Sequence, residues 1–136
     1  MVDTALYAAI SADPFANLLG ATLDEVRPDY ARMSLVITPS LVGPHGKTHG
    51  GTVMSLAESA LAAATHAHGT VHLALNVNIS FHNATTIGDT LIAEVTAQKA
   101  GGRIGCYEMR VVDQNGTLIA TCQAVVYKTN QPLITP

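Results

Sequence analysis

The sequence predicts an α+β fold in which an antiparallel sheet wraps around one central helix, with a short helical segment at the N-terminus. Three observations lead to this prediction. One long alanine-rich stretch has the length and composition of a helix, several stretches alternate apolar and polar residues as strands do, and short turns join the last strands. Short turns imply antiparallel pairing, which leaves the single long helix to pack across one face of the sheet.

The N-terminal part of the chain predicts short helices and then a hairpin. Residues 4–20 are rich in alanine and predict one or two short helices, the second starting at Pro14. Residues 22–29 predict a strand. After Pro28-Asp29, apolar and polar side chains alternate over residues 31–38, so a second strand is expected to pair with the first.

The middle of the chain predicts a loop, a helix and a long strand. Prolines and glycines mark residues 39–46 as a loop. The helix is expected from Gly51 to about His68, with Gly69 as its stop. Residues 71–82 then show the clearest alternation in the chain and predict a strand.

Three further strands are expected near the C-terminus, at about Thr90–Lys99, Arg103–Val112 and Leu118–Lys128. Gly101-Gly102 and Asn115-Gly116 lie between them, and Asn-Gly is a strong signal for a tight hairpin. We therefore expect these strands to follow one another as antiparallel neighbours.

The composition predicts one domain, residues 1–136, that associates with copies of itself. Hydrophobic residues make up 48% of the chain and charged residues 12%, so apolar surface is expected to meet another copy rather than water. A net charge of −3 with seven Lys and Arg argues against a nucleic-acid partner. No apolar run is long enough for a membrane span. An acidic residue lies near the start, where a signal peptide would carry basic residues. The sequence therefore predicts a cytoplasmic protein without a signal peptide or membrane span.

The stretch GPHGKTHGGTVMSLAES, residues 43–59, raises the question of phosphate binding. A P-loop requires a glycine where this chain has Leu41. The sequence His49-Gly50-Gly51 would also interrupt the helix that follows a P-loop lysine. A P-loop is therefore disfavoured.

Glu58 is the only Asp, Glu, Lys or Arg between Lys47 and Asp89. Burying a lone carboxylate is costly, so Glu58 is expected to be exposed, paired or functional. One interpretation is a solvated helix face. The other is that Glu58 acts together with Gly50 and Gly51, whose N–H groups at the positive helix end would form an oxyanion site. A tight turn into the helix would also explain the two glycines.

Helix geometry limits how Gly50 and Glu58 can act together. At roughly 1.5 Å per residue they lie about 12 Å apart along one helix, too far to touch one reacting carbon. Two such helices running antiparallel across a two-fold axis would bring Gly50 of one chain to Glu58 of the other. The sequence therefore predicts that a dimer creates the site, twice per dimer.

The pattern His-Gly-Gly, six residues, and then an acidic residue on an alanine-rich helix resembles the hotdog-fold acyl-CoA thioesterases, particularly the PaaI-like group of phenylacetate catabolism. The resemblance covers residues 14–128. It implies that Glu58 is the catalytic carboxylate and that the Gly50 N–H polarises the thioester carbonyl. It also implies a structural or substrate-loop contact for His49 and a role for Asn76 in holding the attacking water.

One position departs from the family pattern. Six residues before His49, where the family commonly has Asn or Gln, this chain has Gly43. Either His45 or Asn76 is expected to replace the missing partner of the thioester or the water, or the activity is weak or altered.

The resemblance implies hydrolysis of a thioester to a carboxylate and a free thiol, with no cofactor besides the CoA of the substrate. Glu58 would act as general base or as nucleophile, and both routes stay open. A small aromatic acyl group, such as phenylacetyl or hydroxyphenylacetyl, and a homotetramer are expected from the resemblance. The candidate substrate contacts are Gly51, Gly43, His45, Lys47 and Arg103, of which the two basic residues either meet the CoA phosphates or are solvated charges.

Three alternatives stay open at this point. The first is a metal site, suggested by the six histidines, of which His66, His68 and His72 are close in sequence. It is disfavoured because neighbouring carboxylates or cysteines are missing. A hotdog hydratase or dehydratase would need a catalytic histidine placed differently from His49. A non-catalytic acyl-CoA binding or sensing protein would keep the fold without turnover.

Overall fold

The computed structural model describes residues 2–135. Its elements are α1 (Thr4–Ser11), α2 (Pro14–Leu19), β1 (Thr22–Arg27), β2 (Tyr30–Val36), the 3₁₀ turn η1 (Pro39–Leu41), α3 (Gly50–His66), β3 (Thr70–Phe81), β4 (Thr90–Lys99), β5 (Ile104–Asp113) and β6 (Leu118–Pro132). The predicted order of helices and strands is confirmed. The largest difference at an element end is that β6 continues past Lys128 to Pro132.

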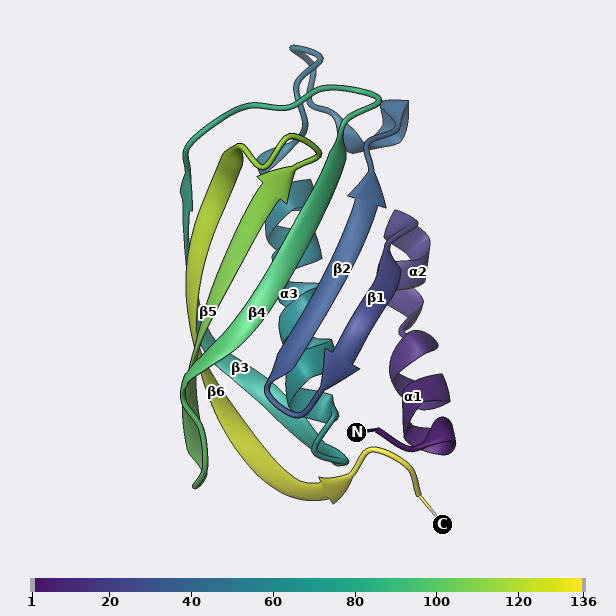
Figure 1. Cartoon of the computed structure of the whole chain (residues 1–136), viewed down its shortest axis with the longest axis vertical. Helices are drawn as coiled ribbons and strands as arrows, with labels where there is room; N and C mark the ends of the chain where they lie inside the picture. The colour runs from purple at the N-terminus through teal and green to yellow at the C-terminus, as the bar shows by residue number, and fades with distance from the viewer. Residues whose placement is uncertain (1, 136) are drawn as a thin grey trace.

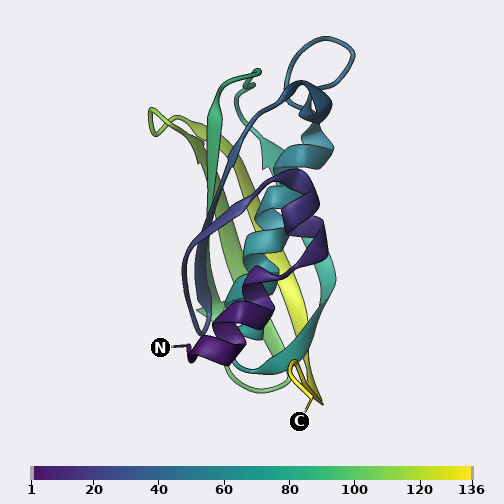
Figure 2. The same cartoon turned by 90° about the vertical axis from the view of Figure 1, so that its right-hand side faces the viewer.

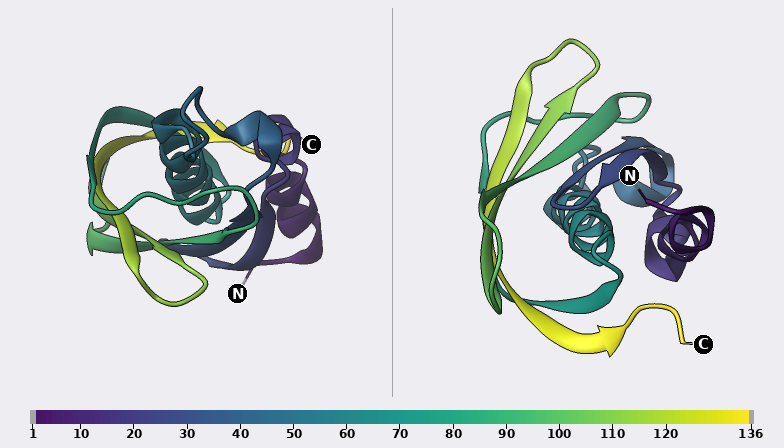
Figure 3. Two further views of the ribbon diagram at one scale, coloured as in Figure 1. Left: turned by 90° about the horizontal axis from the view of Figure 1, so that it is seen from above. Right: turned by 60° about the horizontal axis from the view of Figure 1, so that its bottom comes forward.

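The six strands form one antiparallel sheet in the order β1-β2-β4-β5-β6-β3. The sheet curves around α3, which packs across its concave face, while α1 and α2 lie on the remaining side (Figures 1 and 3). This arrangement is the hotdog fold, so the predicted fold class is confirmed. No helix among residues 2–135 is both long and apolar enough to cross a membrane.

The two N-terminal helices begin at aspartates that satisfy free backbone N–H groups. Asp3 accepts a hydrogen bond from the Leu6 N–H at 2.8 Å, and Asp13 accepts one from the Phe15 N–H at 3.0 Å. Both helices contact α3 and run alongside it (Figure 2). They therefore wall off one side of the central helix.

The β1–β2 hairpin turns at Pro28-Asp29. Asp29 has φ 68°, a left-handed conformation that is uncommon for a residue with a side chain. The Asp29 N–H donates to the Ala64 carbonyl at 3.0 Å, so the turn is attached to the last part of α3. The Asp29 carboxylate is held as well, by His68 and by the hydroxyl of Tyr107.

Small residues let the sheet approach α3 closely. Ten of the side chains on α3 are buried, and half of these ten are alanine or serine: Thr52, Val53, Leu56, Ala57, Ser59, Ala60, Leu61, Ala63, Ala64 and Thr65. Gly51 and Glu58 are exposed on the opposite side of the helix. The chain leaves the helix through Gly69, whose φ of 87° favours glycine.

β3 is an edge strand of this sheet, paired with β6 on one side. A register shift between Ala74 and Asn76 interrupts the alternation that the sequence shows. As a result Leu73 and Leu75 are 54% and 60% exposed, whereas Val77 and Ile79 pack against the core. The predicted strand is confirmed, but the bulge divides its apolar residues between two environments.

Candidate active site at the tip of the central helix

The N-terminus of α3 presents a backbone donor without an acceptor. His49 is the N-cap, and its Nδ1 accepts a hydrogen bond from the Gly51 N–H at 2.8 Å. The N–H groups of Thr52 and Val53 donate to the His49 carbonyl. The Gly50 N–H has no acceptor among residues 2–135, so it is free to bind a ligand oxygen at the positive end of the helix.

Both glycines at this tip are closely approached by aromatic rings. A Cβ atom at Gly50 would lie 3.2 Å from Cζ of Phe81, the last residue of β3. A Cβ atom at Gly51 would lie 2.9 Å from Nδ1 of the capping His49. Glycine at these positions therefore lets Phe81 and His49 sit against the backbone.

A short loop before the helix is folded back on itself. Val42 pairs with Thr48, and the Gly43 N–H donates to the Lys47 carbonyl at 2.8 Å. The imidazole of His45 lies over Gly43, with Cε1 and Nε2 both 3.3 Å from the position of a Cβ atom at that glycine. The ring thus fills the space that a side chain at position 43 would enter.

The hydrogen bonding of His45 also defines its tautomer. Its Nδ1 accepts a hydrogen bond from the Lys47 N–H at 3.0 Å. A neutral ring that accepts at Nδ1 carries its proton on Nε2. His45 is therefore a hydrogen-bond donor through the nitrogen that lies over Gly43.

His45, Lys47 and Gly50 line one open cavity of about 470 Å³. Phe81 and the segment after β3 form its other side, and Thr48 is held there by a hydrogen bond from its N–H to the Thr85 carbonyl at 2.9 Å. The structure thus gathers these three predicted site residues at the helix tip. Gly43 belongs to the loop before the helix, and His49 is the N-cap of the helix; neither of them lines the cavity.

Glu58 lies on the exposed side of α3, eight residues after Gly50. Its carboxylate makes no ion pair with the described part of the chain. The helical rise puts it about 12 Å from Gly50, as expected, so one chain does not bring the two together. Both groups are nevertheless accessible to a second molecule.

Two predicted site residues lie away from the helix tip. Asn76 is opposite Val125 on the sheet and accepts a hydrogen bond from the Asn78 amide at 2.6 Å. Because the neighbouring Ala124 and Val126 point into the core, Asn76 faces away from α3. Arg103 lies in the β4–β5 turn beside His68, near the opposite end of α3, and donates to the Tyr127 hydroxyl.

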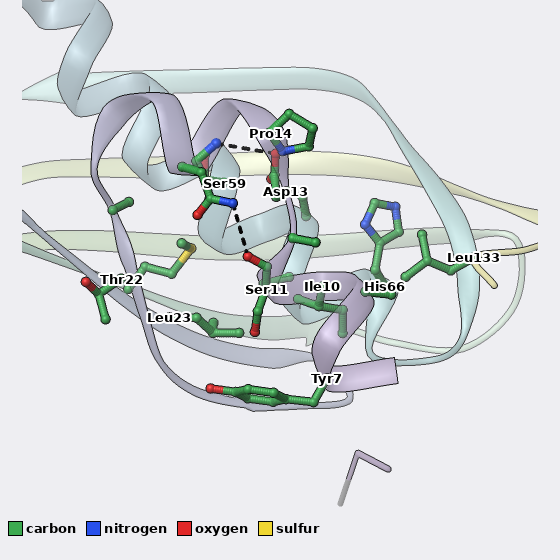
Figure 4. A pocket seen from close by; sticks show the side chains of 18 residues that line it. Tyr7, Ile10, Ser11, Asp13, Pro14, Thr22, Leu23, Ser59, His66 and Leu133 are labelled. Atoms are coloured by element: carbon green, nitrogen blue, oxygen red, sulfur yellow. Dashed lines mark hydrogen bonds between the residues drawn. The ribbon is translucent and has the colours of Figure 1, made fainter. Parts of the chain in front are cut away.

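A second cavity, of about 650 Å³, lies between the N-terminal helices and the later half of α3 (Figure 4). Ser59, Ala62 and His66 line it from α3, and Ser11 lines it from α1. Sequence reasoning did not find this cavity. It depends on where α1 and α2 dock, which the helix signals alone do not specify.

The histidines that suggested a metal site lie around the C-terminal end of α3. His68 Nε2 lies 2.8 Å from Asp29 Oδ1, and the Tyr107 hydroxyl donates to the same oxygen at 2.5 Å. His66 and His72 lie beside this network. Within residues 2–135, no three His, Cys, Asp or Glu side chains form a group that would hold a metal ion.

Comparison with known proteins places this site in a family. The sequence model of the thioesterase superfamily matches residues 45–120, the stretch that carries His45, the tip of α3 and Glu58. The chain belongs to the thioesterase superfamily. It is a thioester hydrolase with the hotdog fold.

Individual relatives agree with this assignment. An Archaeoglobus fulgidus protein that carries an esterase name is 32% identical over 119 residues, which cover 88% of this chain and 77% of that one. The acyl-coenzyme A thioesterase PaaI of Escherichia coli is 28% identical over 114 residues, 84% of this chain and 81% of its own. The solved structure of E. coli PaaI superposes with a TM-score of 0.88 at 25% identity, covering 93% and 91% of the two chains. The chain is thus PaaI-like.

Proposed function

We propose that this protein hydrolyses a small aromatic acyl-CoA, of the phenylacetyl or hydroxyphenylacetyl kind, to the free acid and CoA. The observation that carries the proposal is the Gly50 N–H, left without an acceptor at the start of a helix whose single charged residue is an exposed glutamate. The relationship to the acyl-CoA thioesterase PaaI supports CoA as the thiol. No cofactor besides the substrate's own CoA is required.

The chemistry assigned to the helix tip is stabilisation of negative charge. When a nucleophile adds to the thioester carbon, the carbonyl oxygen becomes an oxyanion, which the Gly50 N–H and the positive helix end stabilise. The tetrahedral intermediate then breaks its C–S bond. Thiolate is a good leaving group, so the site does not need a strong acid.

Glu58 supplies the nucleophile by one of two routes. As general base, its carboxylate takes a proton from water while the oxygen adds to the thioester carbon. As nucleophile, the carboxylate itself adds and expels the thiolate, and water then cleaves the resulting anhydride. Both routes give the same products and both fail without the carboxylate.

We propose that two chains share each site. Gly50 and Glu58 of one chain are too far apart, so an antiparallel partner helix is needed to bring them together. Two features of the chain support such a partner. The unpaired edge of β3 exposes Leu73 and Leu75, and Glu58 stands on the side of α3 that the sheet leaves open. Pairing of two such dimers into a homotetramer is part of the proposal.

His45 is proposed to replace the family's Asn or Gln at position 43. Its ring occupies the space next to the Gly43 Cα, and its Nε2–H donates from there beside the cavity that Gly50 also lines. Asn76 fits this role less well, because it is bonded to Asn78 on the far face of the sheet. His49 acts as the helix cap rather than as the base.

Binding of the CoA phosphates is assigned first to Lys47. This residue is exposed at the cavity that contains Gly50. Arg103 of the same chain lies near the other end of α3, so it would reach a given site only from a partner chain. Cytoplasmic turnover of aromatic acyl-CoA in phenylacetate catabolism is the proposed setting.

Thiol release from a panel of acyl-CoA esters, read with a disulfide dye, tests the proposal. Glu58→Gln is expected to lower kcat at least about a thousandfold with an unchanged thermal midpoint, because the side chain is exposed and unpaired. Mixing this variant with Gly50→Pro chains should restore activity if sites are shared, since some dimers then hold one intact site. Retention of most activity by Glu58→Gln would overturn the mechanism, and failure of mixing would overturn the shared site.

A further inference from the structure

The cavity under α1 and α2 adjoins the proposed catalytic carboxylate. Ala62, which lines the cavity, lies four residues after Glu58, about 6 Å along the helix and roughly 40° around it. Ser59, the residue after Glu58, lines the cavity too. A group attached to a carbon that reacts at Glu58 therefore reaches the cavity within about one helical turn.

The walls of this cavity are mainly apolar. Besides the alanines of α3, the lining includes Ile10, Leu23 and Met33, and Figure 4 shows Tyr7 along one side. At about 650 Å³, the cavity has the size of a small-molecule site. An aromatic ring would bury its faces against these side chains.

Charge excludes an anionic occupant. The lining contains no Lys or Arg, whereas it includes Asp13. Burial lowers the pKa of His66, and the nearby His72 lowers it further, so the imidazole is neutral at pH 7. An acyl group that ends in a carboxylate would enter this cavity without a counter-charge.

Polar groups at the wall lack partners. Ser59 is 6% exposed, and its hydroxyl makes no hydrogen bond with the described residues. Ser11 and His66 line the cavity as well, and their Oγ and Nε2 atoms are buried without hydrogen-bond partners among the described residues. Unpaired buried polar atoms are costly, so a ligand that supplies a hydrogen bond here gains relative to one that does not.

We propose that this cavity receives the acyl group of the substrate and that Ser59 recognises a hydroxyl on its aromatic ring. The inference rests on the proposed function, since it places the reacting carbon at Glu58. It goes further in naming the cavity and the side chain that set acyl specificity. The preferred substrates are neutral, hydroxylated aryl-acyl thioesters.

The test measures binding, so that it does not depend on turnover. Non-hydrolysable thioether analogues of CoA carrying either a hydroxyphenyl or a phenyl group are titrated into the dimeric protein by calorimetry. The wild type should bind the hydroxylated analogue roughly tenfold more tightly. Ser59→Ala should reduce this ratio to near one while leaving binding of the phenyl analogue unchanged.

Ser55→Ala is the matched control. Ser55 lies one turn earlier on α3 and does not line the cavity, so its removal should leave the ratio as in the wild type. Alanine suits both helical positions, so neither change is expected to unfold the protein. A ratio near one in the wild type, or a ratio that Ser59→Ala does not change, overturns the assignment of Ser59.

Ala62→Phe tests the cavity itself. The larger side chain at the mouth should abolish binding of both aryl analogues while an acetyl-sized thioether analogue still binds. If the aryl analogues bind Ala62→Phe normally, the acyl group does not use this cavity. A preparation that binds the analogues as expected but releases no thiol from any acyl-CoA would instead refute only the proposed catalysis.

Discussion

At its N-terminal end α3 presents a backbone N–H without an acceptor, whereas beside its C-terminal end the carboxylate of Asp29 is already bonded to two side chains. Gly50 lines a cavity, and the ring of Phe81 lies against it. Asp29 joins His68 and Tyr107 in a network that holds the β1–β2 turn. Histidines occur at both ends, so their number does not identify the site. What separates the two ends is that the tip has a free backbone donor beside a cavity, whereas the Asp29 carboxylate at the other end already has partners.

Among changes at the two ends of α3, the largest effect is expected from removal of the free Gly50 N–H at the tip. Gly50→Pro removes this donor at the first helical position, where proline is tolerated, and His49 already has the extended backbone that precedes proline. We expect kcat to fall about 100- to 1000-fold in the thiol-release assay. Gly50→Ala is the matched control, because its Cβ meets Phe81 in the same way but its N–H remains. Equal losses in the two variants would show that crowding, not the donor, matters.

A smaller effect on kcat is expected from removing the His45 imidazole and placing a polar side chain at position 43 instead. His45→Gly should lower kcat about tenfold, because the Nε2–H donor over Gly43 is lost. Adding Gly43→Asn to that variant should restore most of the rate, since the space at position 43 is then empty. If the double variant stays as slow as His45→Gly, position 45 does not substitute for position 43.

At the other end of α3, a change should affect stability and not catalysis. Tyr107→Phe removes the hydroxyl that donates to Asp29 at 2.5 Å. Burial and the Asp29 carboxylate raise the pKa of this phenol, so it remains a donor at neutral pH. We expect a loss of about 1–2 kcal/mol in the free energy of unfolding by urea, with kcat unchanged. A large loss of kcat in folded protein would mean that the two ends are coupled.

The smallest expected effect is the pH dependence of stability. Burial lowers the pKa of both His66 and His72 in the folded chain below the value of about 6.5 expected when unfolded. Below that value the unfolded chain binds more protons, so stability is full above about pH 6.5 and declines as pH falls towards the folded pKa values. The urea midpoint should be lower at pH 5.5 than at pH 7.5, and His66→Leu should reduce the difference. An unchanged midpoint would contradict this.

Much of the fold could be predicted from local sequence signals, because each strand and the central helix carry their own pattern. The pairing of β3 with β6 could not, since the two strands are far apart in sequence and the alternation does not name a partner. The bulge after Ala74 was also hidden, and with it the exposure of Leu73 and Leu75. A bulge inserts one residue without a distinctive composition.

The candidate site was predicted in part. Gly50, His45 and Lys47 gather at one cavity because they are close in sequence. Asn76 was placed by resemblance alone, and only the strand register shows which face it takes. The cavity beside Ser59 was missed entirely, because its walls come from elements whose docking depends on tertiary packing.

Phe81 ends the edge strand β3 and also rests on Gly50, so a single ring links the outer rim of the sheet to the helix tip. A neighbour that adds to this rim would steady the ring, and with it the orientation of the amide that meets the thioester. If the neighbouring chain dissociated on dilution, both the Phe81 ring and the Gly50 amide would become less well ordered. If two chains share each site as proposed, specific activity is expected to fall as the protein is diluted.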